Sequence, residues 1–491
     1  MACPQSPTQD AHGVADRLPP GKTLGQPRTA RPAPPHSAHP GPRPRLTAPV
    51  PSAAEPSRTA SHEAGPALTP RTLQASDFAD GPGPGALYRG PSRVWWRATT
   101  LPLSVAAAIA PTAAVLQSKA MAPIAIIAML LAVIAYRREE GRWPWPRGIA
   151  LPFLLALAAW AALSALWAPD LSRALASAGT LAGLALLGAA CAVVVEEEGA
   201  AERRNLVWCL LGGLAAGIAL ATIDHATNQA IRAAVRGLPE RRPGLEFGLK
   251  PAASVMALLL PLLLRLHLGA GWRWLILAAG TGAILLLPGD TAKIAALAGL
   301  LAAGLVWIGG RTLSCLMAAV LAGALLAAPI LVPLMLRPDV AERAPITALH
   351  RMLIWDFALE RAAEKPVLGW GMEASRNLPG GRDNPSPESL ARLHVTPEGE
   401  RAFLTRPGVE RMSLHPHNGA LQIWLELGWI GLALAALAVL ALGWGAGPAA
   451  AGVLASAAVT FAASFGVWQP WWLATEAFAA ALAAGLAMRR V

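Results

Sequence analysis

The chain has 491 residues, of which 54% are hydrophobic and only 14% are charged. A water-soluble protein carries about 25% charged residues, so this composition excludes a soluble globular protein. The formal net charge is +11, but the chain has no recognisable nucleic-acid-binding module and no basic patch interleaved with aromatic residues. We therefore expect no nucleic acid among its partners.

Residues 1–95 are rich in Pro, Ala, Arg, Ser and Gly and contain almost no aromatic residues. Such a segment cannot bury enough surface to offset the entropy of an ordered chain, so we predict a disordered cytoplasmic tail. A start of the reading frame placed too far upstream is the alternative explanation.

Apolar segments then follow in series, most of them roughly 17–25 residues long, the length that crosses about 30 Å of hydrocarbon. They lie near 99–117, 120–136, 149–168, 175–195, 206–223, 252–268, 273–288, 291–309, 312–336, 417–442, 447–466 and 472–488. The sequence therefore predicts an all-α membrane protein with about twelve transmembrane helices. Nine of these helices fall in residues 96–336 and three in residues 417–491, and one large hydrophilic loop, residues 337–416, separates the ninth helix from the tenth. Within this loop we predict a short helix over residues 351–365 and an irregular segment over residues 378–412.

Basic residues mark every second connection between these segments. The series begins with Arg89, Arg93 and Arg97 and ends with Arg489 and Arg490. Because positively charged connections stay in the cytoplasm, both termini are predicted to be cytoplasmic. The large loop then faces the periplasm, and the protein is expected in the inner membrane of a bacterial cell.

His417 is the strongest candidate for chemistry because it stands where the large loop meets the tenth apolar segment. Pro416 suits the first turn of a helix, so we expect His417 at the N-terminus of that helix. The helix dipole there disfavours the imidazolium and keeps the ring neutral, able to accept a proton near pH 7. A histidine that only caps an interfacial helix is one alternative. A metal site formed with His415 is another, although two imidazoles without a Cys or acidic ligand are a weak zinc pattern.

Cationic residues gather on the same predicted side of the membrane. They are Arg232, Arg236, Arg241, Arg242 and Lys250 after the fifth apolar segment, Lys293 at a helix mouth, and Arg351 in the large loop. Guanidinium groups suit phosphate oxygens, so the cluster favours a substrate with an anionic group. Solvated loop charges, partly paired with Glu240 and Glu246, are the alternative.

The pair His417-Asn418, followed after nine residues by Gly428-Trp429-Ile430-Gly431, resembles the motif of the O-antigen ligase and O-antigen polymerase superfamily. Three further pieces resemble the same family. They are Arg351 and Trp355 ahead of Pro366-x-x-Gly369-x-Gly371, residues 164–170, and residues 242–247. The resemblance covers roughly residues 99–488.

This resemblance implies a GT-C-like fold and a glycosyltransferase that needs neither metal nor cofactor. Its donor would be a glycan on an undecaprenyl-diphosphate carrier. His417, Asn418 and Arg351 would be the catalytic residues, with His417 taking the proton of the acceptor hydroxyl. Arg241, Arg242, Lys250, Lys293 and His415 would bind substrate. Gly428, Gly431, Gly369 and Gly371 would be structural, the first two by letting a neighbouring helix pack closely.

Two kinds of acceptor remain open, because ligases use a lipid A–core sugar whereas polymerases use another carrier-linked repeat unit. The implied partners are therefore the carrier-linked donor, a glycan acceptor and membrane lipids. A transporter and a non-enzymatic subunit of a polysaccharide export system are the alternatives from other classes. The chain shows no evident inverted repeat, which argues against a transporter.

Overall fold

The computed structural model describes residues 98–238 and 245–487, and within them the regular elements are helices. The predicted tail, residues 1–95, lies outside the described residues. So do Arg241 and Arg242, two of the predicted substrate-binding residues.

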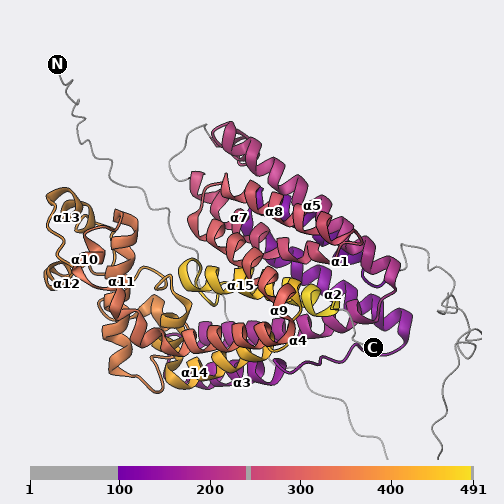
Figure 1. Cartoon of the computed structure of the whole chain (residues 1–491). Coiled ribbons are helices and arrows are strands. Elements are labelled where there is room, and N and C mark those ends of the chain that lie inside the picture. Colours follow the sequence, from indigo (N-terminus) through magenta and orange to yellow (C-terminus); the bar gives the residue numbers. More distant parts are fainter. Residues whose placement is uncertain (1–97, 239–244, 488–491) are drawn as a thin grey trace, which may run out of the picture. The chain divides into compact units, whose positions relative to one another are not determined.

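The predicted apolar segments coincide with helices of the structure (Figure 1). These are α1 (Leu101–Leu116), α2 (Met121–Glu140), α3 (Leu151–Ser164), α4 (Leu171–Glu197), α5 (Ala200–Ala226), α7 (Leu249–Leu259), α8 (Ala270–Leu285), α9 (Asp290–Leu331), α14 (Gly419–Gly443), α15 (Pro448–Ala463) and α16 (Pro470–Gly485). Helix α7 continues as a 3-10 helix, η5 (Leu260–Arg265), and a short helix, α6 (Ala230–Val235), follows α5. Segments 291–309 and 312–336 are the two arms of α9, which is broken at Gly310 with φ 55° and ψ −139°.

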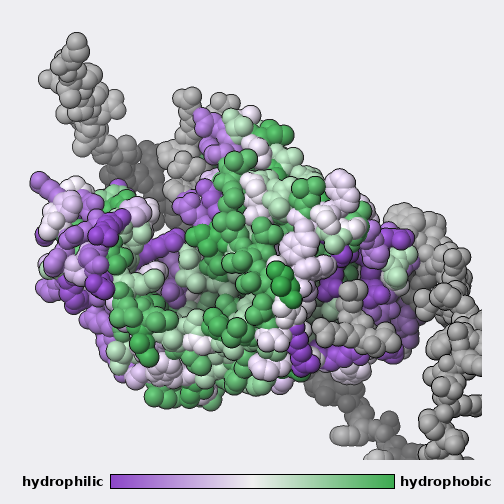
Figure 2. Space-filling view, viewed as in Figure 1, coloured by the Kyte–Doolittle hydropathy of each residue, from purple (hydrophilic) through white to green (hydrophobic). Residues whose placement is uncertain are grey.

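Five helices in the described part of the chain are long and apolar enough to cross a membrane. They are Ser118–Glu140, Leu171–Glu197, Ala200–Ala226, Asp290–Leu331 and Gly419–Gly443. Figure 2 shows apolar side chains over the middle of one face and hydrophilic side chains toward its two ends. This distribution is typical of a multi-pass membrane protein. The number of crossings stays a prediction.

Small residues let these helices approach closely. Gly213 of α5 lies directly against the backbone of Ala107 in α1, where a side chain would overlap the carbonyl oxygen. Gly299 of α9 lies in the same way against Ser456 of α15, whose hydroxyl donates to the carbonyl oxygen of Ala295 at 2.9 Å. Close backbone approach of this kind supplies the van der Waals contact that holds helices together in lipid.

Residues 337–416, called the lid below, contain four helices that share a small apolar core. The helices are α10 (Pro338–Ala341), α11 (Ile346–Glu364), α12 (Pro387–Arg392) and α13 (Glu398–Leu404). Helix α11 is the helix predicted over residues 351–365. The prediction that residues 378–412 are irregular is wrong for α12 and α13. Helix α12 forms because the Ser386 hydroxyl accepts the N–H of Ser389 and Pro387 suits the first turn.

The core of the lid draws side chains from all four helices. It consists of Ala341, Leu349, Met352, Leu353, Leu390, Leu393, Val395, Leu404 and Val409. A separate apolar cluster joins the other face of α11, including Ile354 and Phe357, to α14. Helix α11 therefore fastens the lid to the helix that begins at the His417 junction.

Candidate functional site

The junction between the lid and α14 is built around the cap of that helix. Asn418 is the N-cap, and its Oδ1 accepts the N–H of Leu421 at 3.1 Å. The helix begins at Gly419, so the prediction that Pro416 lies in the first turn is wrong. An asparagine oxygen satisfies one of the free N–H groups of the first turn, which Pro416 cannot do, so the helix starts after Asn418.

His417 precedes this cap in an unusual backbone conformation. Its φ of 55° lies in the left-handed region, which is uncommon for residues other than glycine. Its N–H donates to Nδ1 of His415 at 3.2 Å, and its own Nδ1 lies 2.8 Å from the carbonyl oxygen of Ser464. A carbonyl oxygen can only accept, so Nδ1 of His417 carries the ring proton and Nε2 keeps its lone pair.

Arg351 lies beside His417 and is held by the neighbouring carbonyl. Its guanidinium donates to the carbonyl oxygen of Ala463 at 3.0 Å, one residue before the Ser464 carbonyl that orients His417. Trp355, one turn further along α11, donates its indole N–H to the carbonyl oxygen of Pro416 at 2.8 Å. The end of α15 and one face of α11 thus hold the junction from two directions.

Burial keeps both histidine rings of the junction neutral. Burial is the main reason why the pKa of His417 is lower than its usual 6.5, and the charge of Arg351 lowers it further. Burial, together with His417, lowers the pKa of His415 to about 3. The two rings lie edge to face with their centroids 4.3 Å apart. At pH 7 the site therefore offers an uncharged imidazole beside a guanidinium.

At its break, Gly428, the backbone of α14 forms hydrogen bonds with a segment of the lid. The N–H groups of Trp370 and Gly371 donate to the carbonyl oxygens of Leu425 and Glu426 at 2.9 and 2.8 Å, and the N–H of Trp429 donates to the carbonyl oxygen of Pro366 at 2.9 Å. Gly428 itself has φ 64° and ψ −166°. The lid backbone therefore pairs with the helix backbone that the kink leaves open.

Glycines make this pairing possible. A side chain at Gly428 would overlap the carbonyl of Val367, and one at Gly369 would overlap the carbonyl of Glu426. A side chain at Gly431 would meet Leu427 of its own helix across the kink. The prediction that Gly428 and Gly431 admit a neighbouring helix is therefore wrong, because the close neighbours are lid backbone and the same helix.

The resembling segment at residues 164–170 also contacts this pairing. Gly371 lies against the backbone of Ala168, and the N–H of Met372 donates to the hydroxyl of Ser164 at 3.0 Å. Trp160 of α3 donates its indole N–H to the carbonyl oxygen of Leu427 at 2.9 Å. Residues 366–371 of the lid, which contain Gly369 and Gly371, are called the glycine turn below. Residues 164–170, the glycine turn and the kink of α14 at Gly428 thus form one packed unit.

Glu426 is a buried carboxylate that the sequence analysis missed. One oxygen accepts the N–H of Glu373 at 2.7 Å and the indole N–H of Trp468 at 2.6 Å. The other accepts the amide of Gln422 at 3.1 Å and the hydroxyl of Ser375. The side chain is 0% exposed. Its sequence signal is one acidic residue inside the apolar run from Leu421 to Gly431.

The Glu426 carboxylate is connected to the histidines through residues 464–469. Gln422, which donates to Glu426, accepts the N–H of Val467 at 3.0 Å. Within the same segment, Nε2 of Gln469 lies 3.3 Å from Nε2 of His415. The segment that orients both histidines is therefore anchored on the polar network around Glu426.

The predicted cations divide into two groups. Arg232 is fully buried and pairs with Asp224 at 2.6 Å, while Arg236 donates to the carbonyl oxygen of Leu116 at 2.7 Å. Lys250 lies against Gly289, and Lys293 is 34% exposed and 3.5 Å from Asp290. These last residues surround the start of α9, which runs antiparallel to α15.

That arrangement puts Lys293 at the same end of the bundle as the junction. Ala295 of α9 bonds with Ser456 of α15, so the start of α9 lies level with the end of α15, where Ala463 and Ser464 hold Arg351 and His417. Lys293 is consequently near this end, and the structure does not bring it into an ion pair with the junction.

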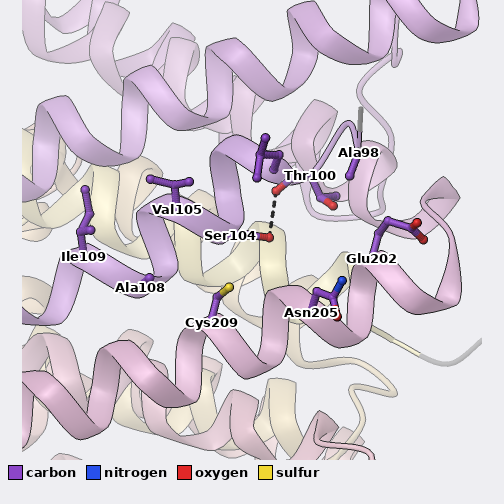
Figure 3. A pocket seen from close by; sticks show the side chains of 10 residues that line it. Ala98, Thr100, Ser104, Val105, Ala108, Ile109, Glu202, Asn205 and Cys209 are labelled. Atoms are coloured by element: carbon purple, nitrogen blue, oxygen red, sulfur yellow. Dashed lines mark hydrogen bonds between the residues drawn. The ribbon is translucent and has the colours of Figure 1, made fainter. Parts of the chain in front are cut away.

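A small cavity of about 290 Å³ opens elsewhere, between α1 and α5 (Figure 3). Ser104, whose hydroxyl donates to the carbonyl of Thr100, lines it together with Glu202, Asn205 and Cys209. None of the predicted site residues lines this cavity, so it takes no part in the candidate site.

Residues 275–436 match the family model described as O-Antigen ligase. This part of the chain is similar to the O-antigen ligase family. The resemblance of the His417–Gly431 segment to that family is thereby confirmed, and the match also contains the glycine turn and the lid. The segments 164–170 and 242–247 lie outside it.

Several curated proteins of Rickettsia species are similar to parts of the chain. A protein of Rickettsia conorii named "Putative polysaccharide ligase" is 35% identical over 99 residues, which cover 20% of each chain. A protein of Rickettsia felis with the same name is 28% identical over 149 residues, covering 29% of this chain and 33% of the relative. The chain thus matches between a fifth and a third of the length of these two relatives. No solved structure matches the chain.

Proposed function

We propose that the protein transfers a glycan from an undecaprenyl-diphosphate carrier to a lipid-linked acceptor. The observation that carries this proposal is the neutral His417, whose Nδ1 faces the Ser464 carbonyl at 2.8 Å and whose Nε2 therefore keeps a lone pair beside Arg351. The family match and the names of the relatives support a polysaccharide ligase. Their names favour a ligase over a repeat-unit polymerase of the same superfamily, which is the second candidate.

The proposed reaction is a displacement at the anomeric carbon of the donor sugar. The acceptor oxygen forms a bond to that carbon, the bond to the diphosphate oxygen breaks, and both bonding electrons leave with the diphosphate. His417 Nε2 takes the proton of the acceptor hydroxyl. Arg351 stabilises the charge that grows on the leaving diphosphate. The overall balance needs no metal or other cofactor.

The remaining predicted residues have supporting roles in this proposal. Lys250 and Lys293 bind the diphosphate from the same end of the bundle as the junction, and Arg241 and Arg242 bind it as well. His415 accepts the N–H of His417 and fixes its backbone. Asn418 caps α14 and thereby sets the height of His417 in the membrane. Lys293 carries one charge but offers no bidentate fork, so it acts as a point charge.

The proposed topology has twelve crossings in a bacterial inner membrane, with a GT-C-like arrangement. Both termini face the cytoplasm, and the lid faces the periplasm, where carrier-linked glycans and their acceptors meet. The apolar middle and hydrophilic ends in Figure 2 support a membrane crossing between the two ends of the bundle, and the distribution of basic residues supports the side proposed for each end.

Transfer by the purified protein tests the proposal. With a carrier-linked oligosaccharide and a lipid acceptor in proteoliposomes, the parent protein should form glycosylated acceptor, and His417→Ala should lower the rate at least about 100-fold because it removes the proton acceptor. His225→Ala, an exposed histidine on α5, is the matched control and should keep the parent rate.

Each alternative gives a different result in this assay. Movement of the oligosaccharide across the bilayer without transfer would identify a transporter, and neither movement nor transfer would point to a non-enzymatic subunit. Normal transfer by folded His417→Ala would remove the role assigned to this residue.

A further inference from the structure

A second, larger cavity lies at the end of the bundle opposite the lid. It has a volume of about 1030 Å³ and is lined by Arg142, Arg203, Arg265, His267 and Arg273, among others. Glu197, the last residue of α4, also lines it, whereas Asp170 caps the other end of α4 near the glycine turn. Helix α4 has 27 residues, so at about 1.5 Å per residue the cavity is about 40 Å from that turn.

Two arginines of this cavity lack the partners that buried guanidinium groups require. Arg265 makes no hydrogen bond and no ion pair within residues 98–238 and 245–487, and its Nε is buried. The Nε of Arg273 is likewise buried without a partner, and this side chain makes one hydrogen bond, to the carbonyl oxygen of Leu264 at 3.1 Å. Buried charged donors without acceptors are costly, so the cavity is incomplete without an anion.

The two carboxylates of α4 in the cavity lining do not supply that anion. Glu197 is 2.6 Å from Arg142 and 3.2 Å from Arg147, and Glu196 is 2.9 Å from Arg147. These pairs lie along the side of the cavity formed by α4. Arg265 and Arg273 come instead from η5 and α8, and no acidic side chain pairs with either in the described part of the chain.

Aromatic side chains around the cavity indicate where the anion comes from. Arg273 stacks on Trp307 at 5.6 Å, and Trp272 beside it is 64% exposed. Trp143 and Trp145, which follow Arg142, are 50% and 76% exposed. Tryptophans in such positions are typical of the level of lipid headgroups, where basic pockets between helices bind anionic lipids.

We propose that Arg265 and Arg273 bind the phosphate of an anionic membrane lipid whose headgroup enters this cavity. Their free N–H groups supply charge-assisted hydrogen bonds to the phosphate oxygens, and Arg203, which also lines the cavity, adds a third positive charge. This site is separate from the glycan-transfer site and does not depend on the proposed function.

Lipid binding by the full-length protein tests the proposal. Purified protein is placed in nanodiscs of phosphatidylcholine alone or of phosphatidylcholine with phosphatidylglycerol, and the retained lipid is measured by native mass spectrometry. The parent should retain phosphatidylglycerol selectively, and the double variant Arg265→Gln/Arg273→Gln should retain at least about tenfold less. Arg204→Gln, an exposed arginine on α5 outside the cavity lining, is the matched control and should behave as the parent.

The following outcomes, a replacement variant and a phosphate control complete the experiment. Equal retention by the parent and a folded double variant would overturn the proposal, and so would a parent without preference for phosphatidylglycerol. If the double variant does not fold, Arg265→Lys/Arg273→Lys replaces it, and this variant should bind more weakly than the parent because it loses the guanidinium forks. Thermal stabilisation by inorganic phosphate but not by phosphatidylglycerol would show that the site takes a free anion, which contradicts a lipid ligand.

Discussion

The chemistry of His417 depends on which of its ring nitrogens carries the proton. The Ser464 carbonyl holds the proton on Nδ1, so the acceptor nitrogen is fixed without help from a carboxylate. The left-handed backbone at His417 directs this ring toward the end of α15 rather than along α14. A strained backbone at a candidate catalytic residue persists only because its surroundings hold it, here His415, Trp355 and Asn418.

Transfer should stay active at mildly acidic pH. Protonation of Nε2 removes the base, so the rate falls as pH decreases through the pKa of His417, and burial places that pKa below the usual 6.5. The dependence of kcat/KM on pH in proteoliposomes should therefore show its acidic limb below pH 6.5. A limb centred at or above this value would contradict the neutral, buried ring.

Replacing Glu426 should weaken the whole junction. In Glu426→Leu, the N–H of Glu373 and the indole of Trp468 lose their acceptor, and each buried donor left unpaired costs about 1–3 kcal/mol. Glu426→Gln keeps one acceptor oxygen and should lose less. Thermal unfolding in detergent measures both, with the exposed Glu360→Gln as the control. A Glu426→Leu protein as stable as the parent would show that the network is dispensable.

At this scale the sequence identified His417 and Arg351 but not their surroundings. The spacing from His417 to Gly428 is visible in the chain, whereas the partners of Glu426 come from residues 373–375 and 468. No local pattern can show contacts between such distant segments. The predicted start of α14 was wrong because Pro416 suits the first helical position whereas Asn418 suits the N-cap. In the structure, Asn418 is the N-cap.

At the scale of the elements, the kink of α14 and the glycine turn of the lid are held together by hydrogen bonds, and this contact is called the joint below. Three backbone hydrogen bonds join them, and Trp160 of α3 bonds to the carbonyl of Leu427 within the same kink. The joint fixes the lid to the membrane helices close to the network that orients the histidines. Its geometry therefore determines where the lid sits above the junction.

Gly428→Ala should disrupt this joint. The added methyl group would overlap the Val367 carbonyl, and the backbone conformation, with positive φ and extended ψ, is essentially restricted to glycine and costs other residues about 1–3 kcal/mol. We expect a lower unfolding temperature and faster proteolysis of the lid. Gly304→Ala in α9 is the control, because nothing lies within 4 Å of the added group. That change should be neutral or slightly stabilising, and an equal effect of both changes would contradict the joint.

Long helices were predictable because their apolar length is a property of one continuous segment. The short helices α12 and α13 were not, because six or seven mostly polar residues show no periodicity. Tertiary contacts, rather than local composition, define these two helices. The break at Gly310, by contrast, falls between the predicted segments 291–309 and 312–336.

The whole molecule is polarised along the direction of its long helices. The candidate transfer site and the lid lie at one end, and the basic cavity lies at the other. Hydropathy alone indicates the membrane, but the side on which each end lies follows only from the distribution of basic residues. The orientation is consequently the part of the architecture that most needs a direct measurement.

Cysteine labelling in right-side-out spheroplasts gives that measurement. In a background without the native cysteines, Glu388→Cys in the lid should react with a membrane-impermeant maleimide if the lid faces outward, as we propose. Arg204→Cys in α5 should react only after permeabilisation, because it lies at the opposite end. Both side chains are exposed, so access to the reagent depends on the side of the membrane. The reverse labelling pattern would invert the topology.

The joint between the glycine turn and α14 also determines which residues of such a protein can be substituted without loss of its structure. Its hydrogen bonds run from the backbone of Trp370, Gly371 and Trp429 to carbonyl oxygens, and these atoms are the same in every amino acid. Substitutions along both segments therefore leave the bonds intact, provided that the glycines at the points of contact remain. A distant relative can keep this geometry while sharing little more than the spacing of its glycines.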